Sequence, residues 1–199
     1  RLNTLMSLKK TFIDKYQSKP LEHYKRTKNH IPPWILCTSI TFGKALMWFG
    51  ILRDTDKQDI CDLYFNHYNL TTNEQKELLK QSLSLLKEYR NLIAHGNRVF
   101  NNFPLPQLPK HALTTIFCNT LLESEYNKGL GRCDTYAIIL SLLLLLVDNY
   151  SIQNFLYELY SALKTHEEFE ICHTHVFEFL NLPNDILSRL EYIMNNFKR

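Results

Sequence analysis

The stretch TTNEQKELLKQSLSLLKEYRNLIAHG, residues 71–96, decides the fold class. It opens with a capping box, in which Thr71 is the N-cap and Glu74 follows three positions later. Placed at about 100° per residue, its apolar side chains gather on one broad stripe, as a helix that buries one face requires. Gly96 then marks a common type of helix end. The stretch therefore predicts one long helix, ending near His95. The expected buried stripe consists of Leu78, Ser82, Leu85, Leu86, Tyr89, Leu92 and Ile93.

Apolar residues recur at three- and four-residue steps over most of the chain, and no alternating run bounded by turns is found. We therefore expect an all-α domain. Residues 18–30, 100–109 and 127–132 are polar or rich in proline or glycine, and are expected to be loops. Gly43 is expected to break the second of the further helices. These helices are expected at residues 2–16, 32–49, 55–68, 134–148, 151–165 and 183–196.

Length and composition set the class of protein. The chain has 199 residues, of which 45% are hydrophobic and 22% charged, as in a globular domain. With 5 glycines and 7 prolines it is not of low complexity. We expect an N-terminal helix and loop in residues 1–30 and a helical domain in residues 31–199.

Net charge and cysteine content limit the partners and the cellular location that can be expected. The net charge of +3 permits an anionic partner without requiring one, and the basic residues Lys25, Arg26 and Lys28 are expected in a solvated loop. The five cysteines are widely spaced, with no C-x-x-C, which argues against a disulfide framework and a structural zinc site. The most apolar stretch, residues 136–147, is shorter than the roughly 20 residues of a membrane span. A buried core helix and a cytoplasmic location are expected.

Three polar side chains close the long helix. Asn91 and His95 are four residues apart and stack on the side opposite the stripe, while Arg90 lies on the flank. An imidazole can take or give a proton near neutral pH, and a guanidinium can hold a phosphate and stabilise charge on its oxygens. With RNA, the ribose 2′-hydroxyl can be the attacking group, so that cleavage needs no metal. The products would be a 2′,3′-cyclic phosphate and a 5′-hydroxyl.

The spacing of Arg90 and His95 also fits a purely structural interpretation. Arg90 could pair with a carboxylate such as Glu88, and His95 could cap the last carbonyl groups of the helix. An arginine and a histidine five positions apart also arise by chance in a chain of this composition. The spacing alone therefore leaves both interpretations open.

The sequence segments around these residues resemble those of a known protein family. Residues 89–101, YRNLIAHGNRVFN, resemble the R-N-x-x-A-H-x-x-R-x-x-N signature of the bacterial Abi family (AbiD/AbiF-like), abortive-infection proteins with a HEPN-type domain. Upstream, PPWI at 32–35 and SITFG at 39–43 are similar to that family's P-x-W and S-F-G block, with Thr41 as a departure. The resemblance extends over residues 30–199. Because members usually carry a longer N-terminal region, residues 1–30 look like its remnant.

The resemblance implies a HEPN-like helical bundle and a metal-independent endoribonuclease of phage defence. Its R-x4-H motif maps onto Arg90 and His95, with Asn91 in the variable second place; His95 would be the general acid/base and Arg90 would hold the phosphate. Arg98 and Asn101 would position phosphate or shape the turn. HEPN sites are usually composite, so a single motif implies a homodimer with two motifs in one cleft. RNA is the implied partner, as substrate or as a dedicated small RNA, with no cofactor, metal or membrane. The alternative is a non-catalytic RNA-binding or interaction module of the same fold.

Three other groups of residues could serve a function, but a structural role is expected for each. The cluster between Glu168 and His175 lacks the ligand spacing of a zinc finger and is expected to be a solvated turn. Trp34, Trp48 and Phe49 could stack on bases, but their helical spacing favours the core. Cys61 and Cys118 have no histidine nearby in sequence that would suggest a thiol nucleophile.

Overall fold

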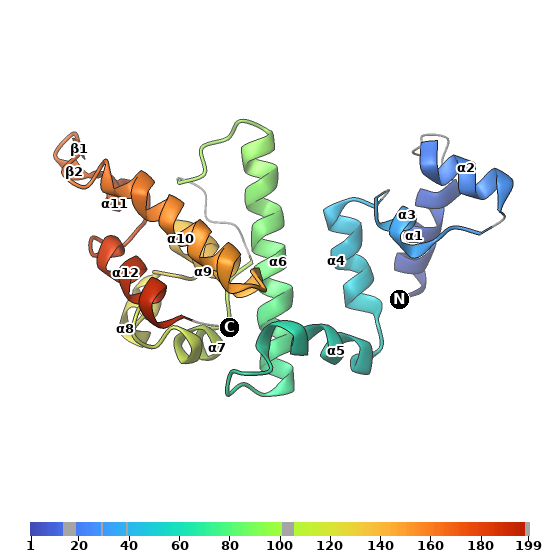
Figure 1. Ribbon diagram of the computed structural model, residues 1–199, viewed down its shortest axis with the longest axis horizontal. Coiled ribbons are helices and arrows are strands. Elements are labelled where there is room, and N and C mark those ends of the chain that lie inside the picture. Colours follow the sequence, from blue (N-terminus) through green and yellow to red (C-terminus); the bar gives the residue numbers. More distant parts are fainter. Residues whose placement is uncertain (14–18, 29, 39, 101–105, 198–199) are drawn as a thin grey trace. The chain divides into compact units, whose positions relative to one another are not determined.

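The structure, a computed structural model, describes residues 1–13, 19–28, 30–38, 40–100 and 106–197 (Figure 1). The chain divides into two compact units, which we call unit 1 (residues 1–57) and unit 2 (residues 58–199). Both are built from helices, and the expected all-α class is confirmed. The two-unit division follows Lys57; the boundary expected at residue 30 stays a prediction.

The described residues of unit 1 form four short helices and the start of a fifth. In its interior, α1 packs on α4 and α2 on α3, and two leucines, Leu8 and Leu21, are buried. Two sequence expectations are wrong here. Residues 19–27, expected as a loop, form α2, with Pro20 in the first turn where its missing N–H costs nothing. The break expected at Gly43 falls earlier, because Thr41 caps α4 by accepting the Lys44 N–H at 3.3 Å. The helices are α1 (Leu2–Ile13), α2 (Lys19–Thr27), α3 (Pro33–Cys37), α4 (Phe42–Ile51) and α5 (Asp54–Phe65).

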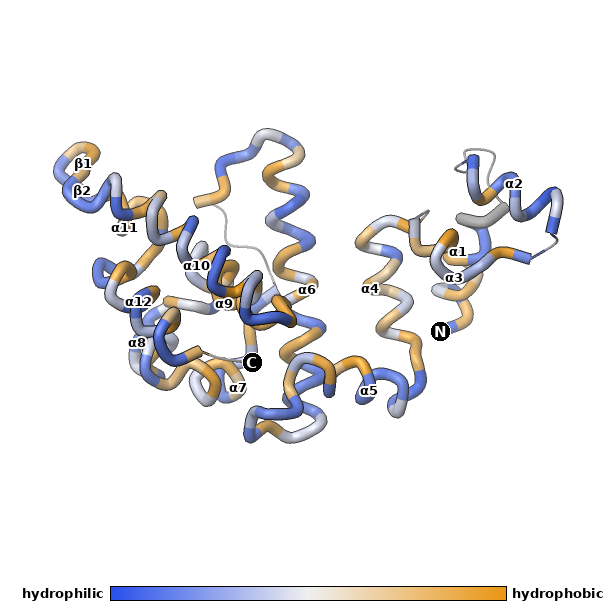
Figure 2. Tube along the Cα trace, in the orientation of Figure 1, coloured by the Kyte–Doolittle hydropathy of each residue, from blue (hydrophilic) through white to orange (hydrophobic). Residues whose placement is uncertain are grey.

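Unit 2 is organised around α6 (Thr72–Ala94), the longest helix in the described part of the chain. Orange and blue alternate along α6 in Figure 2, as its amphipathic sequence requires. Its apolar side packs on α9, whose eleven residues include seven that are buried. α10 packs on α12. The elements after α6 are α7 (Lys110–Ile116), α8 (Glu123–Lys128), α9 (Thr135–Leu145), α10 (Asn149–Lys164), β1 (Glu170–Ile171), β2 (Thr174–His175), α11 (Val176–Phe179) and α12 (Ile186–Asn196).

Buried polar contacts join the helices of unit 2. The hydroxyl groups of three buried tyrosines, Tyr89, Tyr126 and Tyr136, each donate to a backbone carbonyl, at 2.7, 2.5 and 2.7 Å. Arg189 of α12 forms two hydrogen bonds with the carboxylate of Glu125 in α8, at 2.5 and 3.1 Å. This pairing lowers the pKa of Glu125. Such contacts satisfy polar groups that would otherwise be costly to bury, and so fix α8, α9 and α12 together.

The described residues contain one two-stranded antiparallel ladder, β1–β2, that the sequence did not predict. It is joined by Cys172 and His173, both with positive φ (51° and 63°). Two-residue hairpin turns of this kind need left-handed residues, and Asn-Gly or Gly pairs usually supply them. Because Cys-His is not a turn signal, the hairpin is invisible in the sequence pattern.

Candidate nucleic-acid site at the end of helix α6

The start of α6 follows the sequence prediction. The Thr71 hydroxyl accepts the Glu74 backbone N–H at 3.3 Å, and the Glu74 carboxylate accepts the Thr71 N–H at 2.8 Å, so the capping box is complete. The predicted stripe is buried at Leu78, Ser82, Leu85 and Tyr89. Beyond Tyr89 the stripe prediction is wrong at Ile93, which is 63% exposed, while Leu92 is half-buried. The last turn of α6 therefore lies beyond the cover of its own core.

Tyr89 fixes the helix just before this exposed turn. Its hydroxyl donates to the carbonyl oxygen of Cys133 at 2.7 Å, between residues 44 positions apart. Burial raises the pKa of the phenol, which stays neutral and can donate this bond. Arg90 is the next residue, so the motif begins at a backbone position held from within the core.

The helix ends in a Schellman motif. The N–H of Asn97 donates to the carbonyl of Leu92 at 2.9 Å, and the N–H of Gly96 donates to Ile93 at 3.0 Å. Gly96 has φ of 68°, which glycine adopts without steric cost. The predicted helix end at Gly96 is confirmed, and the chain turns away from the helix axis directly after His95 (Figure 1).

Arg90 and His95 are exposed at this end, and Asn91 is half-buried. Within the described residues, neither the guanidinium of Arg90 nor the imidazole of His95 forms a hydrogen bond or ion pair. Glu88, the carboxylate that could have held Arg90, pairs instead with Lys87 at 2.6 Å. The carbonyls of the last turn are capped by backbone N–H groups rather than by the His95 ring. The described structure thus lacks the contacts that the structural interpretation of the motif requires.

The segment after the motif is anchored by residues that the sequence did not single out. The Phe100 ring lies 4.8 Å from that of Phe179 in α11, and its carbonyl accepts a hydrogen bond from the Asn181 amide. Arg98 is exposed between the helix end and this anchor. Asn101 lies outside the described residues. No local pattern signals the anchor, because its partners are about 80 positions apart in the chain.

The remaining sequence candidates have structural roles or none. His175 accepts the Phe177 N–H at 3.2 Å and its Nε2 lies 2.7 Å from the Glu167 carbonyl, so it caps α11. Across the residues that the structure describes, no group of three or more His, Cys, Asp or Glu side chains is placed to hold a metal ion. Burial raises the pKa of the Cys61 thiol to about 11, which makes it a poor nucleophile. The core assignment of Trp34 is wrong, because the side chain is 67% exposed.

A family model described as Abi-like protein matches residues 2–101, about half of the chain. The chain belongs to this family. The match includes both sequence blocks that resemble Abi proteins, at 32–43 and 89–101, and it begins at residue 2 rather than near residue 30. No curated protein and no solved structure gives a significant match. Among the helices described, none is long and apolar enough to cross a membrane.

Arg90, Asn91 and His95 thus fall within the matched Abi-like region and lie on one exposed helix end. Arg90 and His95 are separated by about 7.5 Å along the axis and about 140° around it, given the rise and twist of an α-helix. Asn91 and His95 are about 40° apart and share a face. This arrangement leaves the guanidinium and the imidazole exposed on different sides of one helix end, with the Asn91 amide on the side of His95.

Proposed function

We propose that this Abi-like protein is a metal-independent, HEPN-type endoribonuclease of abortive-infection defence, acting in the cytoplasm. Its site would be composite, with Arg90 and His95 contributed by each of two copies. The observation that supports it best is the exposed, unpaired state of both side chains within the described residues. An arginine kept for fold stability would be expected to use the neighbouring carboxylate of Glu88, which is already paired with Lys87.

The chemistry follows from the two side chains. His95 of one copy would accept the proton of a ribose 2′-hydroxyl as its oxygen attacks the adjacent phosphorus. His95 of the other copy would give a proton to the 5′-oxygen as the P–O bond breaks. Arg90 would hold the phosphate and stabilise the charge that grows on its free oxygens. The products are a 2′,3′-cyclic phosphate and a 5′-hydroxyl, and Asn91 would orient His95 or the substrate.

The helix geometry favours a site shared by two copies. Because Arg90 and His95 of one copy point about 140° apart, one copy alone presents them to different directions. Ile93, exposed in the same turn, offers an apolar contact of the kind that becomes buried in a subunit interface. Arg90 lies about 60° around the helix from Ile93 and His95 is the last residue of the helix end, so a two-fold axis at this end, beside Ile93, would bring both motifs to one cleft. Arg98 and Asn101 would then contact phosphate or shape the turn at its edge.

Cleavage of RNA by purified protein in the presence of EDTA tests the enzymatic proposal. We expect His95→Ala to lower the rate about 10²–10⁴-fold, the usual range for a general acid–base group. Arg90→Ala should lower it about 10²–10³-fold, as loss of a charge-stabilising donor does. His166→Ala and Arg26→Ala change exposed residues outside the motif, serve as matched controls and should cleave normally. Wild-type rates in His95→Ala would refute the assignment, and RNA binding without cleavage by the wild type would identify the non-catalytic module instead.

The solution mass tests the composite site. We expect a dimer for the wild type and a monomer for Ile93→Glu, with loss of cleavage. Leu63→Glu changes another exposed apolar residue of unit 2 and should leave both the mass and the cleavage unchanged. A cleaving monomer, or an Ile93→Glu protein that remains dimeric, would contradict a shared site around Ile93.

A further inference from the structure

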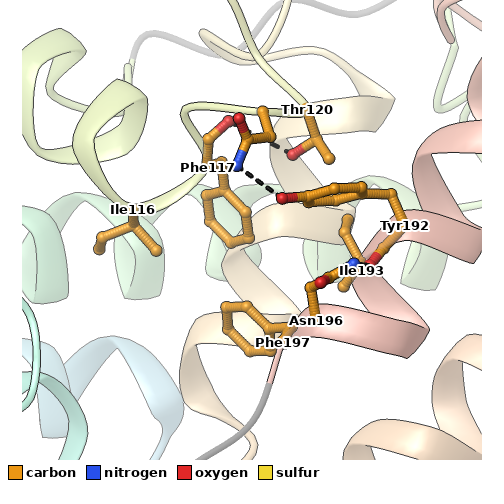
Figure 3. A pocket seen from close by; sticks show the side chains of 8 residues that line it. Ile116, Phe117, Thr120, Tyr192, Ile193, Asn196 and Phe197 are labelled. Atoms are coloured by element: carbon orange, nitrogen blue, oxygen red, sulfur yellow. Dashed lines mark hydrogen bonds between the residues drawn. The ribbon is translucent and has the colours of Figure 1, made fainter.

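A small pocket in unit 2 opens between the end of α7 and the last helix, α12 (Figure 3). Its volume is about 130 Å³. Its place in the fold is set by two contacts near the start of α6: His111 of α7 with Glu74, 2.5 Å apart, and Phe197 with Tyr68, whose rings are 6.5 Å apart. The pocket is lined by Ile116, Phe117, Asn119, Thr120, Tyr192, Ile193, Asn196 and Phe197.

Aromatic rings form much of its wall. The rings of Phe117 and Phe197 are stacked with an angle of 9° between their planes and 5.6 Å between their centroids. Tyr192 stands beside them and is 41% exposed (Figure 3). Rings of this kind bind other flat rings, as aromatic side chains stack on bases in proteins that bind single-stranded nucleic acid.

The polar groups of the pocket define what such a ring must carry. The Asn119 amide N–H donates to the Tyr192 hydroxyl oxygen at 2.6 Å, and the Asn196 amide N–H donates to the Tyr192 carbonyl at 2.8 Å. Within the described residues, both amide oxygens have no hydrogen-bond donor, and the Tyr192 hydroxyl hydrogen has no acceptor. The pocket therefore offers acceptors and a donor side by side, and no charged side chain lines it. A neutral ring with adjacent N–H and C=O groups complements it.

The size of the pocket selects among such rings. A protein cavity of about 150 Å³ is known to take benzene. A pocket of about 130 Å³ thus matches the size of one six-membered ring better than that of a fused two-ring system. Among nucleobases, the pyrimidines have one ring and carry both N–H and C=O groups on one edge: N3–H beside C=O in uracil, and an amino N–H and C2=O on either side of N3 in cytosine. The purines have two rings.

We infer that this pocket binds a pyrimidine base, uracil or cytosine, from an RNA strand or a free nucleoside. Since α6 is 23 residues long, the pocket and His95 lie near opposite ends of a helix of about 34 Å. A bound strand could place one pyrimidine here, several nucleotides from a phosphate at the α6 end. If one RNA strand occupies both places, the inference rests on the proposed function. It then adds a preference for RNA that carries a pyrimidine several nucleotides from the cleaved phosphate.

Binding experiments test the pocket without reference to cleavage. Uridine, cytidine and adenosine are titrated and followed by NMR of the ligand. The His95→Ala protein is used, so that the same protein can also be tested with oligonucleotides without cleaving them. We expect the two pyrimidine nucleosides to bind more tightly than adenosine. Tyr192→Phe and Asn119→Ala should each weaken binding about three- to tenfold, the effect of one lost hydrogen bond. Tyr157→Phe, at an exposed tyrosine of α10 outside the pocket, should leave it unchanged.

Oligouridine and oligoadenosine of ten nucleotides distinguish the two sources of the base. Binding of oligouridine that depends on Tyr192 would identify an RNA base, while binding confined to the free nucleosides would identify a nucleoside site. If no pyrimidine probe binds, if adenosine binds equally well, or if the pocket variants match Tyr157→Phe, the inference is wrong. A pyrimidine-binding protein that fails to cleave RNA would refute the nuclease and leave the pocket intact.

Discussion

The buried carboxylate of Asp134 gives a quantitative prediction for the stability of unit 2. Asp134 is the N-cap of α9, and its two oxygens accept the Ala137 and Gly131 N–H groups, both at 2.8 Å. Its side chain is buried beneath the turn that joins α8 to α9. Burial raises the pKa of Asp134 from 3.8 to about 6, although the two hydrogen bonds act in the opposite direction.

The sign of the pH effect follows from this raised pKa. Below about pH 4 the carboxyl is protonated in both the folded and the unfolded chain, and its titration costs no stability. Between about pH 4 and 6 the unfolded chain releases this proton more readily, so the free energy of unfolding falls as the pH rises. A difference of about two pKa units corresponds to about 3 kcal/mol, all of it lost above pH 6.

Asp134→Asn removes this titration and serves as the comparison. The amide keeps one acceptor but turns its NH₂ toward a backbone N–H, so the variant should be less stable than the wild type at acid pH.

The measurement is urea unfolding between pH 3.5 and 7, followed by circular dichroism at 222 nm. Tryptophan fluorescence is a poor probe, because Trp34 and Trp48 both lie in unit 1. We expect the stability advantage of the wild type to shrink by about 3 kcal/mol from pH 4 to 7. An advantage that stays constant over that range, or grows, would refute the reasoning.

Three further predictions concern the stability and the local motion of unit 2. Tyr89→Phe should lower the free energy of unfolding by about 1–3 kcal/mol, because it leaves a buried carbonyl without its donor; thermal unfolding measures this. Gly131→Ala should cost more than Gly96→Ala in the same assay. Both have positive φ, but a Cβ at Gly131 would lie 3.0 Å from Leu121, whereas Gly96 has open space. Phe179→Ala should speed hydrogen exchange at residues 96–100 with little change in α9, and equal protection in both proteins would contradict the anchoring of this segment.

Much of the fold could be predicted because its signals are local. The capping box of Thr71 and Glu74, the left-handed Gly96 and the apolar run of α9 each act within a few residues, and each is confirmed. The errors arise where tertiary packing decides. In α5, for example, Cys61 and Phe65 are buried while the apolar Leu63 between them is exposed. A helix wheel shows which residues share a face but not where the neighbouring helices stop.

In the candidate site, too, the features that depend on local sequence could be predicted and those that depend on tertiary packing could not. The sequence placed Arg90 and His95 together at one helix end, and this placement depends only on the helix. The sequence also placed them off the buried stripe, but whether another element covers them depends on how far the core extends along α6, which no local pattern indicates. The anchor of Phe100 on α11 joins residues about 80 positions apart, and no short-range pattern indicates it. Their roles in catalysis and RNA binding stay predictions.

The direction of α6 has a consequence for any phosphate that reaches its last turn. Proteins that bind anions commonly use the amino end of a helix, whose dipole attracts them, whereas the carboxyl end repels them. At this end the carbonyls of Leu92 and Ile93 already accept backbone N–H groups, which moderates the repulsion. Side chains must supply the remaining attraction, so Arg90 has to counter the helix field as well as hold the ligand. Retention of an anion here should therefore weaken steeply with added salt, more than at a site built on an amino end.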